Sequence, residues 1–208
     1  MLSSSVGLMT KYPLLGKVKA RLAAHIGDEK SLEVFTMLLQ GAVNVTCSLD
    51  SSEFLRAAFI GAGGLIENFS GQYPGFDRYF RQDGEDLGER MATALSTLIE
   101  QEGARKAMLI GSDAPELTAD IIKDANNLLG SHDLVLGPCV NGGYYLIGMR
   151  KVVPDLFFNI DWRSNDVLNA TMETAGKKKL NVGLLPELRD LDTIDDLNYF
   201  KDRFSTIL

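Results

Sequence analysis

Four cations gather around a short loop near the N-terminus of an otherwise acidic chain. Positions 11–22 read KYPLLGKVKARL, so that a Pro/Gly loop leads into a helix pattern. Free backbone N–H groups, the positive end of a helix and basic side chains together favour phosphate binding. The segment is therefore a candidate phosphate site, although it lacks the Gly-Lys-Ser/Thr ending of a Walker A loop. The alternative is a solvated basic helix start.

A carboxylate follows an apolar run in the middle of the chain. Asp113 stands in GSDAP at 111–115, directly after the run at 107–110. Mg²⁺ and Mn²⁺ are held by one or two carboxylates when substrate phosphates and water complete the shell. Asp113 is thus a candidate metal ligand; alternatively, it bonds N–H groups of its own loop, as turn aspartates commonly do.

Glycine, amide and hydroxyl groups follow the next apolar run, in GPCVNGGYY at 137–145. Gly142 and Gly143 let a ligand or another strand approach the backbone closely. Asn141 and Tyr144 offer hydrogen bonds to hydroxyl groups. A glycine-rich hairpin turn with packing tyrosines explains the same residues equally well.

Two further segments carry polar groups beside predicted helix starts. Gln82 opens the stretch QDGEDLGERM, and its amide can both donate to and accept from the edge of a nucleobase. Asp86 in that stretch is better explained as a helix N-cap. Asp192, in the stretch DLDT, is a candidate second metal ligand, although Thr193 marks the same place as an ordinary helix entry.

The elements that must position these groups alternate between strand and helix. Compact apolar runs predict strands at 6–9, 54–60, 78–80, 107–110, 134–136 and 182–185. Apolar positions on one face predict helices within 87–98, 121–129 and 167–172, and N-cap signals stand at Thr118, Ser164 and Thr193. The alternation indicates an α/β fold with a largely parallel sheet, whose ligands bind beyond the carboxyl ends of the strands.

Composition limits the function classes. The chain of 208 residues suits one domain, and its net charge of −7 argues against a broad surface for nucleic acid or anionic membranes. No stretch is apolar enough for a membrane span, and the N-terminus carries no secretion signal. The two cysteines are far apart in sequence and the two histidines lack a ligand-like spacing, which argues against a disulfide scaffold and a zinc site. A cytoplasmic protein is therefore expected.

Five motifs in this order resemble one family. They are KxPxxGKVKxRL at 11–22, QxGxDLGERM at 82–91, GSDxP at 111–115, GPxxxGGYYLIG at 137–148 and DLDT at 190–193. The chain is similar to the radical-SAM/selenodomain-associated transferases, a glycosyltransferase-like group within the nucleotide-diphospho-sugar transferase (GT-A) superfamily. The resemblance implies a single GT-A, Rossmann-like domain over residues 1–208. In that fold, helices cover both faces of a mostly parallel central sheet, and a nucleotide is bound with Mg²⁺ or Mn²⁺.

The resemblance also implies roles for individual residues. The phosphates would contact Lys11, Gly16, Lys19 and Arg21; the base pocket would include Gln82 and Gly88; the sugar or acceptor would meet Asn141, Gly142, Gly143 and Tyr144. Asp113 would bind the metal and Asp192 would complete its site. Lys19, Arg21 and Asp113 are then the expected catalytic residues, because they and the metal offset charge on the leaving diphosphate.

The chain departs from the family pattern at three positions. Ala20 replaces a usual threonine, so that one hydroxyl near the phosphates is lost. Asn141 replaces a usual aspartate, and an amide can neither act as a base nor ligate a divalent metal well. Ala114 replaces a frequent cysteine without an expected effect.

Three functions are compatible with this pattern. The first is a metal-dependent transfer from a nucleotide-diphospho-sugar to an unidentified acceptor, for which Asp86 or Asp192 are the only guesses at a general base. The second is a nucleotidyltransferase resembling the phospholactate guanylyltransferase and molybdenum-cofactor enzymes. In those enzymes a substrate phosphate attacks an NTP and no protein base is needed. The third is a nucleotide-binding protein without catalysis.

Overall fold

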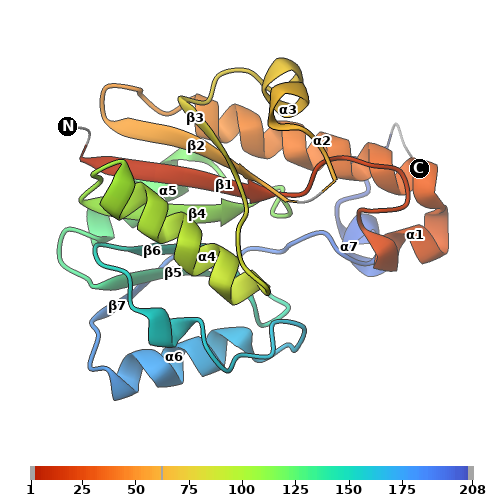
Figure 1. Ribbon diagram of the computed structural model, residues 1–208. Coiled ribbons are helices and arrows are strands. Elements are labelled where there is room, and N and C mark those ends of the chain that lie inside the picture. The colour runs from red at the N-terminus through yellow and green to blue at the C-terminus, as the bar shows by residue number, and fades with distance from the viewer. Residues whose placement is uncertain (1–2, 62, 206–208) are drawn as a thin grey trace.

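The structure is a computed structural model that describes residues 3–61 and 63–205. Strands and helices alternate along the chain, as Figure 1 shows. The strands are β1 Ser4–Thr10, β2 Phe54–Ile60, β3 Arg78–Arg81, β4 Lys106–Gly111, β5 Leu134–Pro138, β6 Tyr144–Met149 and β7 Val182–Leu184. The helices are α1 Ala20–Ile26, α2 Asp28–Cys47, α3 Ile66–Gln72, α4 Leu87–Ser96, α5 Ala119–Leu128, α6 Val167–Lys177 and α7 Ile194–Tyr199, with a π-helical turn at Thr97–Gln101 and a 3₁₀ turn at Pro154–Leu156.

Within the described residues the strands form one seven-stranded sheet in the order β3-β2-β1-β4-β6-β5-β7. Every pair is parallel except those that β6 makes with β4 and β5. The mostly parallel α/β sheet expected from the sequence is thus confirmed. The strand β6 was not predicted, because its glycine and tyrosine start is also typical of a turn; residues 139–143 are that turn, and the chain reverses through it.

Helices cover both faces of the sheet, as expected (Figure 1). On one face, Phe35 and Leu39 of α2 and Ile122 of α5 pack against β1 and its neighbours. On the other face, Leu95 of α4 and Ala175 of α6 pack against β4 and β6. No helix in the described part of the chain combines the length and the hydropathy that a membrane crossing requires.

A third apolar cluster fixes the C-terminal segment against the start of the chain. Leu22 of α1, Leu38 of α2 and Leu197 of α7 pack together with Leu191, which is fully buried. Because side chains of an extended segment alternate between two sides, the aspartates on either side of Leu191 are turned away from this cluster. The cluster therefore sets where both aspartates lie.

Several local predictions are settled by the hydrogen bonds. Strand β1 begins at Ser4 rather than at position 6, because the Ser4 hydroxyl donates to Asn126 Oδ1 at 2.7 Å and can be buried. Thr118 and Thr193 cap α5 and α7 as predicted, and Thr193 does so within a capping box. Ser164 was wrongly predicted as a cap: α6 begins at Val167, its N-cap is Asp166, and the backbone N–H of Asp166 donates to the Ser164 hydroxyl.

Candidate functional site at the carboxyl end of the sheet

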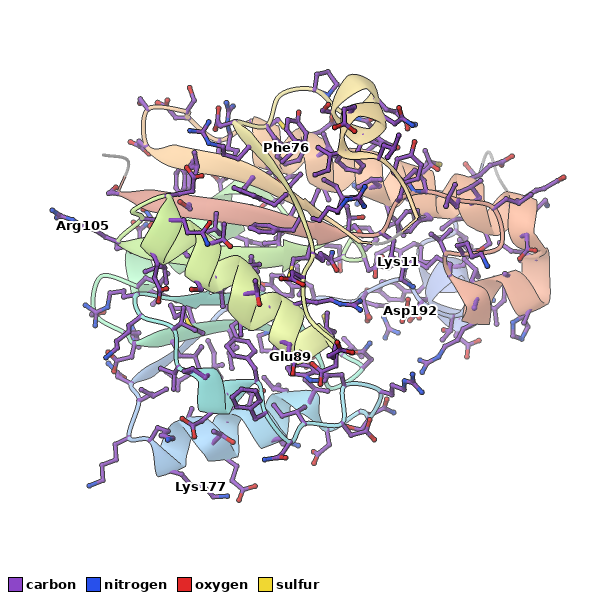
Figure 2. All side chains as sticks on the ribbon, viewed as in Figure 1. Lys11, Phe76, Glu89, Arg105, Lys177 and Asp192 are labelled. Carbon is purple, nitrogen blue, oxygen red and sulfur yellow. The ribbon has the colours of Figure 1, made fainter. Side chains whose placement is uncertain are left out.

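Loops that are far apart in sequence meet beyond the carboxyl ends of β1, β4 and β5. The backbone N–H of Leu191 donates to the carbonyl of Asp113 at 2.8 Å, and that of Val140 donates to Leu188 at 3.0 Å. Lys11 and Asp192 lie at this same end in Figure 2. The candidate phosphate loop, the candidate metal ligand and the C-terminal aspartates therefore border one site.

Lys19 occupies the centre of this site. Its Nζ lies 2.7 Å from Asp113 Oδ1, 3.0 Å from Asp192 Oδ1 and 2.6 Å from the carbonyl oxygen of Leu191. The Lys19 side chain is only 3% exposed, whereas the Asp113 and Asp192 side chains are 44% and 38% exposed. An ammonium group has three N–H donors, so each has a protein oxygen and none is left for a phosphate in this conformation.

The charge state of Lys19 follows from the same contacts. Burial alone lowers its pKa, but the carboxylates of Asp113 and Asp192 outweigh burial and the pKa is raised from the ordinary lysine value. The raised pKa favours the charged form of Lys19, which places a cation between the two carboxylates.

The backbone holds Lys19 in an unusual conformation. Its φ of 48° lies in the left-handed region, which non-glycine residues seldom adopt. The Lys19 carbonyl accepts hydrogen bonds from Ala23 N at 2.8 Å and from the Ser31 hydroxyl at 3.2 Å. These bonds hold the strained Lys19 backbone at the start of α1.

Asp190 belongs to the site, although the sequence analysis did not select it. The Asn141 amide donates to Asp190 Oδ2, while Asn141 Oδ1 accepts from Gly143 N at 3.0 Å. Burial, followed by the charge of Asp192, raises the pKa of Asp190 to about 6. The signal available in the sequence was the DLD alternation, in which a buried leucine separates two carboxylates on the same side.

A divalent cation fits the oxygens at this site. Asp113 and Asp192 each direct an oxygen at one cationic atom, the Nζ of Lys19, so the two carboxylates already converge on a position for positive charge. Within the described residues, no group of three or more His, Cys, Asp or Glu side chains is assembled to hold a metal. Two carboxylates completed by substrate phosphates and water are the ligation that Mg²⁺ and Mn²⁺ accept. The ion itself stays a prediction.

The basic loop is open to solvent beside the carboxylates. Lys11, Gly16 and Arg21 are exposed, and Gly16 has a φ of 69° that glycine adopts readily. Among the residues that the structure describes, neither Lys11 nor Arg21 takes part in an ion pair. Their charges are therefore available to an anion, and their role in phosphate binding stays a prediction.

The glycine-rich turn packs against the segment that leads into α6. Gly142 has a φ of 85°, and any side chain there would collide with the carbonyl oxygen of Asn165. Its own carbonyl accepts from Leu168 N at 2.8 Å. The Tyr144 hydroxyl is buried and has no hydrogen-bond partner among the residues that the structure describes, and its ring lies edge-on to Trp162. Packing thus explains Gly142, while Asn141 contacts the carboxylate of Asp190 and Gly143 bonds Asn141.

Gln82 and Gly88 contact protein groups. Gln82 Nε2 donates to the carbonyls of Thr10 and Phe59 at 3.0 Å each, which joins β3 to the ends of β1 and β2. Gly88 lies where a side chain would collide with the Phe157 carbonyl and with Trp162. These contacts account for both residues without a ligand, and their roles in binding a base stay predictions.

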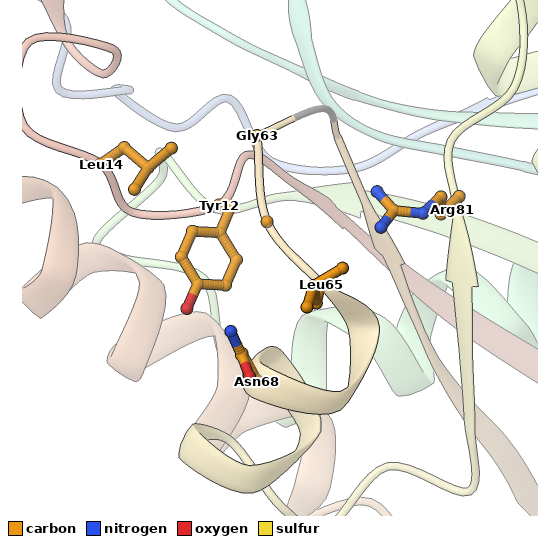
Figure 3. A pocket seen from close by; sticks show the side chains of 7 residues that line it. Tyr12, Leu14, Gly63, Leu65, Asn68 and Arg81 are labelled. Carbon is orange, nitrogen blue, oxygen red and sulfur yellow. The ribbon is translucent and has the colours of Figure 1, made fainter.

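A cavity of about 520 Å³ lies beside the basic loop (Figure 3). It is bordered by the loop after β1, the loop after β2, α3 and the end of β3, and is lined by Tyr12, Leu14, Gly63, Gly64, Leu65, Asn68 and Arg81. The sequence analysis selected only the loop after β1, which holds Tyr12 and Leu14. The other lining residues come from two separate segments, and the paired glycines after β2 were the signal for a binding loop there.

The chain belongs to a family of uncharacterized proteins conserved in bacteria, DUF2064, whose model matches residues 56–164. A crystal structure from Desulfovibrio desulfuricans G20, provisionally assigned as a nucleotide-diphospho-sugar transferase, is 33% identical, with 98% of this chain and 88% of that chain covered and a TM-score of 0.89. The association with radical-SAM and selenodomain proteins stays a prediction. Comparison with curated proteins gives no match.

More distant structures share the fold. The inositol-1-phosphate CTP transferase of Thermotoga maritima (T. maritima) is 13% identical with a TM-score of 0.59, and the alignment covers 99% of this chain and 96% of that chain. The manganese complex of Rv0371c from Mycobacterium tuberculosis H37Rv is 12% identical with a TM-score of 0.52, and the alignment covers 96% of this chain and 97% of that chain. These likenesses confirm the GT-A-like α/β fold.

Proposed function

We propose that this protein is a transferase that uses a nucleotide-activated donor together with Mg²⁺ or Mn²⁺. The observation that carries the proposal is the convergence of Asp113 and Asp192 on one cation position, beside an exposed basic loop. The assignment of the similar Desulfovibrio protein supports a nucleotide-diphospho-sugar as donor, and the manganese complex of the Mycobacterium protein supports a divalent ion.

The metal would be held by Asp113 and Asp192 and would offset the negative charge of the donor phosphates. Lys11, Gly16 and Arg21 bind the remaining phosphate oxygens, because they are exposed at the same end of the sheet and have charge or N–H groups to spare. These groups favour departure of the diphosphate by stabilising the charge that develops on it.

The nucleobase occupies the cavity beside the basic loop. Tyr12 contributes an aromatic ring from the loop after β1, Asn68 contributes an amide from α3, and Arg81 contributes a guanidinium group from β3 (Figure 3). Gln82 contributes indirectly, because its amide fixes the ends of the strands below this cavity. The sugar and the acceptor then lie toward Asn141 and the turn that contains it.

A nucleotidyltransferase is the second candidate, and one observation favours it. Asn141 is an amide engaged with Asp190, so this position cannot supply a general base for an acceptor hydroxyl. A phosphate nucleophile attacking an NTP needs positioning and a metal but no such base. The fold likeness to the inositol-1-phosphate CTP transferase agrees with this chemistry.

Ligand-dependent melting tests the proposal. Purified protein is heated with NTPs, NDPs and NDP-sugars, with and without Mn²⁺, and the bound donor is then incubated with metabolite extracts. Metal-dependent stabilisation, about 2.7 kcal/mol at a hundred times the Kd, is the expected result. Release of NDP supports glycosyl transfer, release of pyrophosphate supports nucleotidyl transfer, and binding without turnover supports a non-catalytic protein. The absence of any nucleotide effect contradicts both enzymes.

A further inference from the structure

The ammonium group of Lys19 bonds one oxygen of each of the two carboxylates that would hold the proposed metal. Asp113 Oδ1 and Asp192 Oδ1 both face Nζ, at 2.7 and 3.0 Å. The third donor of the ammonium is taken by the carbonyl of Leu191, so this cation is fully ligated by protein. A side chain that is 3% exposed and fully bonded is in the position that a structural ion would take.

Charge makes the two cations competitors. With Lys19 in place, the Asp113–Asp192 pair has a net charge of −1; with Lys19 removed, the same pair offers −2 to a metal. A metal bound beside the ammonium would also face a positive charge a few ångströms away in a partly desolvated site, where repulsion is stronger than in water. Electrostatics therefore favours exchange over coexistence.

We propose that Lys19 is a resident counter-cation of Asp113 and Asp192, and that a divalent metal binds this protein by displacing it. This inference rests on the proposed function, because it concerns the metal of that site. Lys19 keeps the two carboxylates together in the metal-free protein. Once displaced, its three N–H groups become available to the donor phosphates. Lys19 is thus a positioning residue before metal binding and a phosphate ligand after it.

Mn²⁺ affinity without nucleotide tests the exchange directly. Free Mn²⁺ is measured by electron paramagnetic resonance in titrations of wild type, Lys19→Met and Lys19→Arg. Lys19→Met is expected to bind Mn²⁺ at least about tenfold more tightly than wild type, because the competing charge is gone. Lys19→Arg keeps the charge and is expected to stay as weak as wild type or weaker.

A second buried ion pair supplies the control. Arg56 lies 2.7 Å from Asp77, and both side chains are mostly buried. Arg56→Met also removes a partly buried cation, but in the amino-terminal half of β2, whereas the site lies at the carboxyl ends of the strands; it is expected to leave Mn²⁺ affinity unchanged. Tighter binding in both methionine variants would point to a general effect of net charge and would overturn the inference.

The wild-type protein gives an independent readout that requires no variant to fold. Lysines are methylated reductively and quantified by mass spectrometry, with exposed Lys11 as the internal reference. Lys19 is expected to be protected without metal and to become labelled as Mn²⁺ saturates the site. Continued protection at saturating Mn²⁺ would overturn the exchange.

The outcomes separate this inference from the proposed function. If wild type binds Mn²⁺ and nucleotide but Lys19→Met binds Mn²⁺ no more tightly, the exchange is wrong and the proposed function stands. If wild type binds neither Mn²⁺ nor nucleotide, both are wrong. If wild type binds nucleotide but neither wild type nor Lys19→Met binds Mn²⁺, the proposed metal site and the exchange are both wrong, and nucleotide binding alone remains.

Discussion

The side-chain amide of Asn141 donates a hydrogen bond to the carboxylate of Asp190, which joins the turn between β5 and β6 to the segment before α7. The family pattern that the sequence resembles predicts an aspartate at position 141. In this chain an aspartate there would place a second carboxylate against Asp190, whereas the amide supplies the donor that a half-buried carboxylate needs. The substitution therefore fits the local charge balance.

Asn141→Asp is expected to destabilise the protein near neutral pH. The new carboxylate removes the donor and repels Asp190, which costs about 1 kcal/mol of unfolding free energy at a partly solvated site. Urea denaturation at pH 7.5 measures the effect. Asn141→Ala removes the hydrogen bond without adding charge and should lose less; equal losses in the two variants would contradict the repulsion.

Asp190→Asn is expected to change the pH dependence of stability. The pKa of Asp190 is raised from 3.8 to about 6 in the folded protein. Folding thus favours the protonated acid, and this contribution is present below about pH 4 and lost as the pH rises through about 6. The neutral variant should match wild type at pH 4 and exceed it by about 1 kcal/mol at pH 7.5, a value reduced for solvent screening. A pH-independent difference would contradict the raised pKa.

Thr193→Ala is expected to loosen the segment that holds Asp192. Thr193 caps α7 within a capping box, and its loss should cost about 1 kcal/mol of stability. Thr118→Ala removes the cap of α5 and serves as the matched control. Both variants should melt lower, but only Thr193→Ala should weaken Mn²⁺ binding. Equal Mn²⁺ affinity in the two variants would show that the cap does not position Asp192.

Arg81→Gln is expected to weaken nucleotide binding about tenfold, because Arg81 supplies a charged donor to the proposed base cavity. Arg105→Gln is the control: Arg105 is exposed at the opposite end of the sheet from Lys11 and Asp192 (Figure 2). Calorimetric titration with the best nucleotide measures both. An Arg81 variant that binds like the control would exclude this cavity as the base site.

The regular elements were largely predictable because their hydrophobic periodicity is local. The run 54–60 gave β2 with its exact bounds, and Thr193 marked the start of α7. Strand β6 was not predicted, because Tyr144 at its start and the two glycines before it are also typical of a turn. Helix α2 was not predicted, although its buried residues follow helical spacing; its second half carries no charged residue that marks the exposed face.

The candidate site was predictable in part. Asp113, Asp192 and Lys19 were each selected, and the structure brings them into contact. Their mutual arrangement was not predictable, because the contact spans residues 19 to 192 and depends on the burial of Leu191. The raised pKa of Asp190 is likewise a property of tertiary burial.

Isothermal titration of wild type and Asp113→Asn with the preferred nucleotide, in Mn²⁺ and in EDTA, tests the central claim most directly. Asp120→Asn, which alters an exposed carboxylate on α5, is the control. The account predicts Mn²⁺-dependent binding that Asp113→Asn weakens by about a hundredfold, or about 2.7 kcal/mol, while Asp120→Asn binds as wild type does. Equal nucleotide affinity in Mn²⁺ and in EDTA, or undiminished Mn²⁺-dependent binding by Asp113→Asn, would contradict a metal-assisted nucleotide site at Asp113.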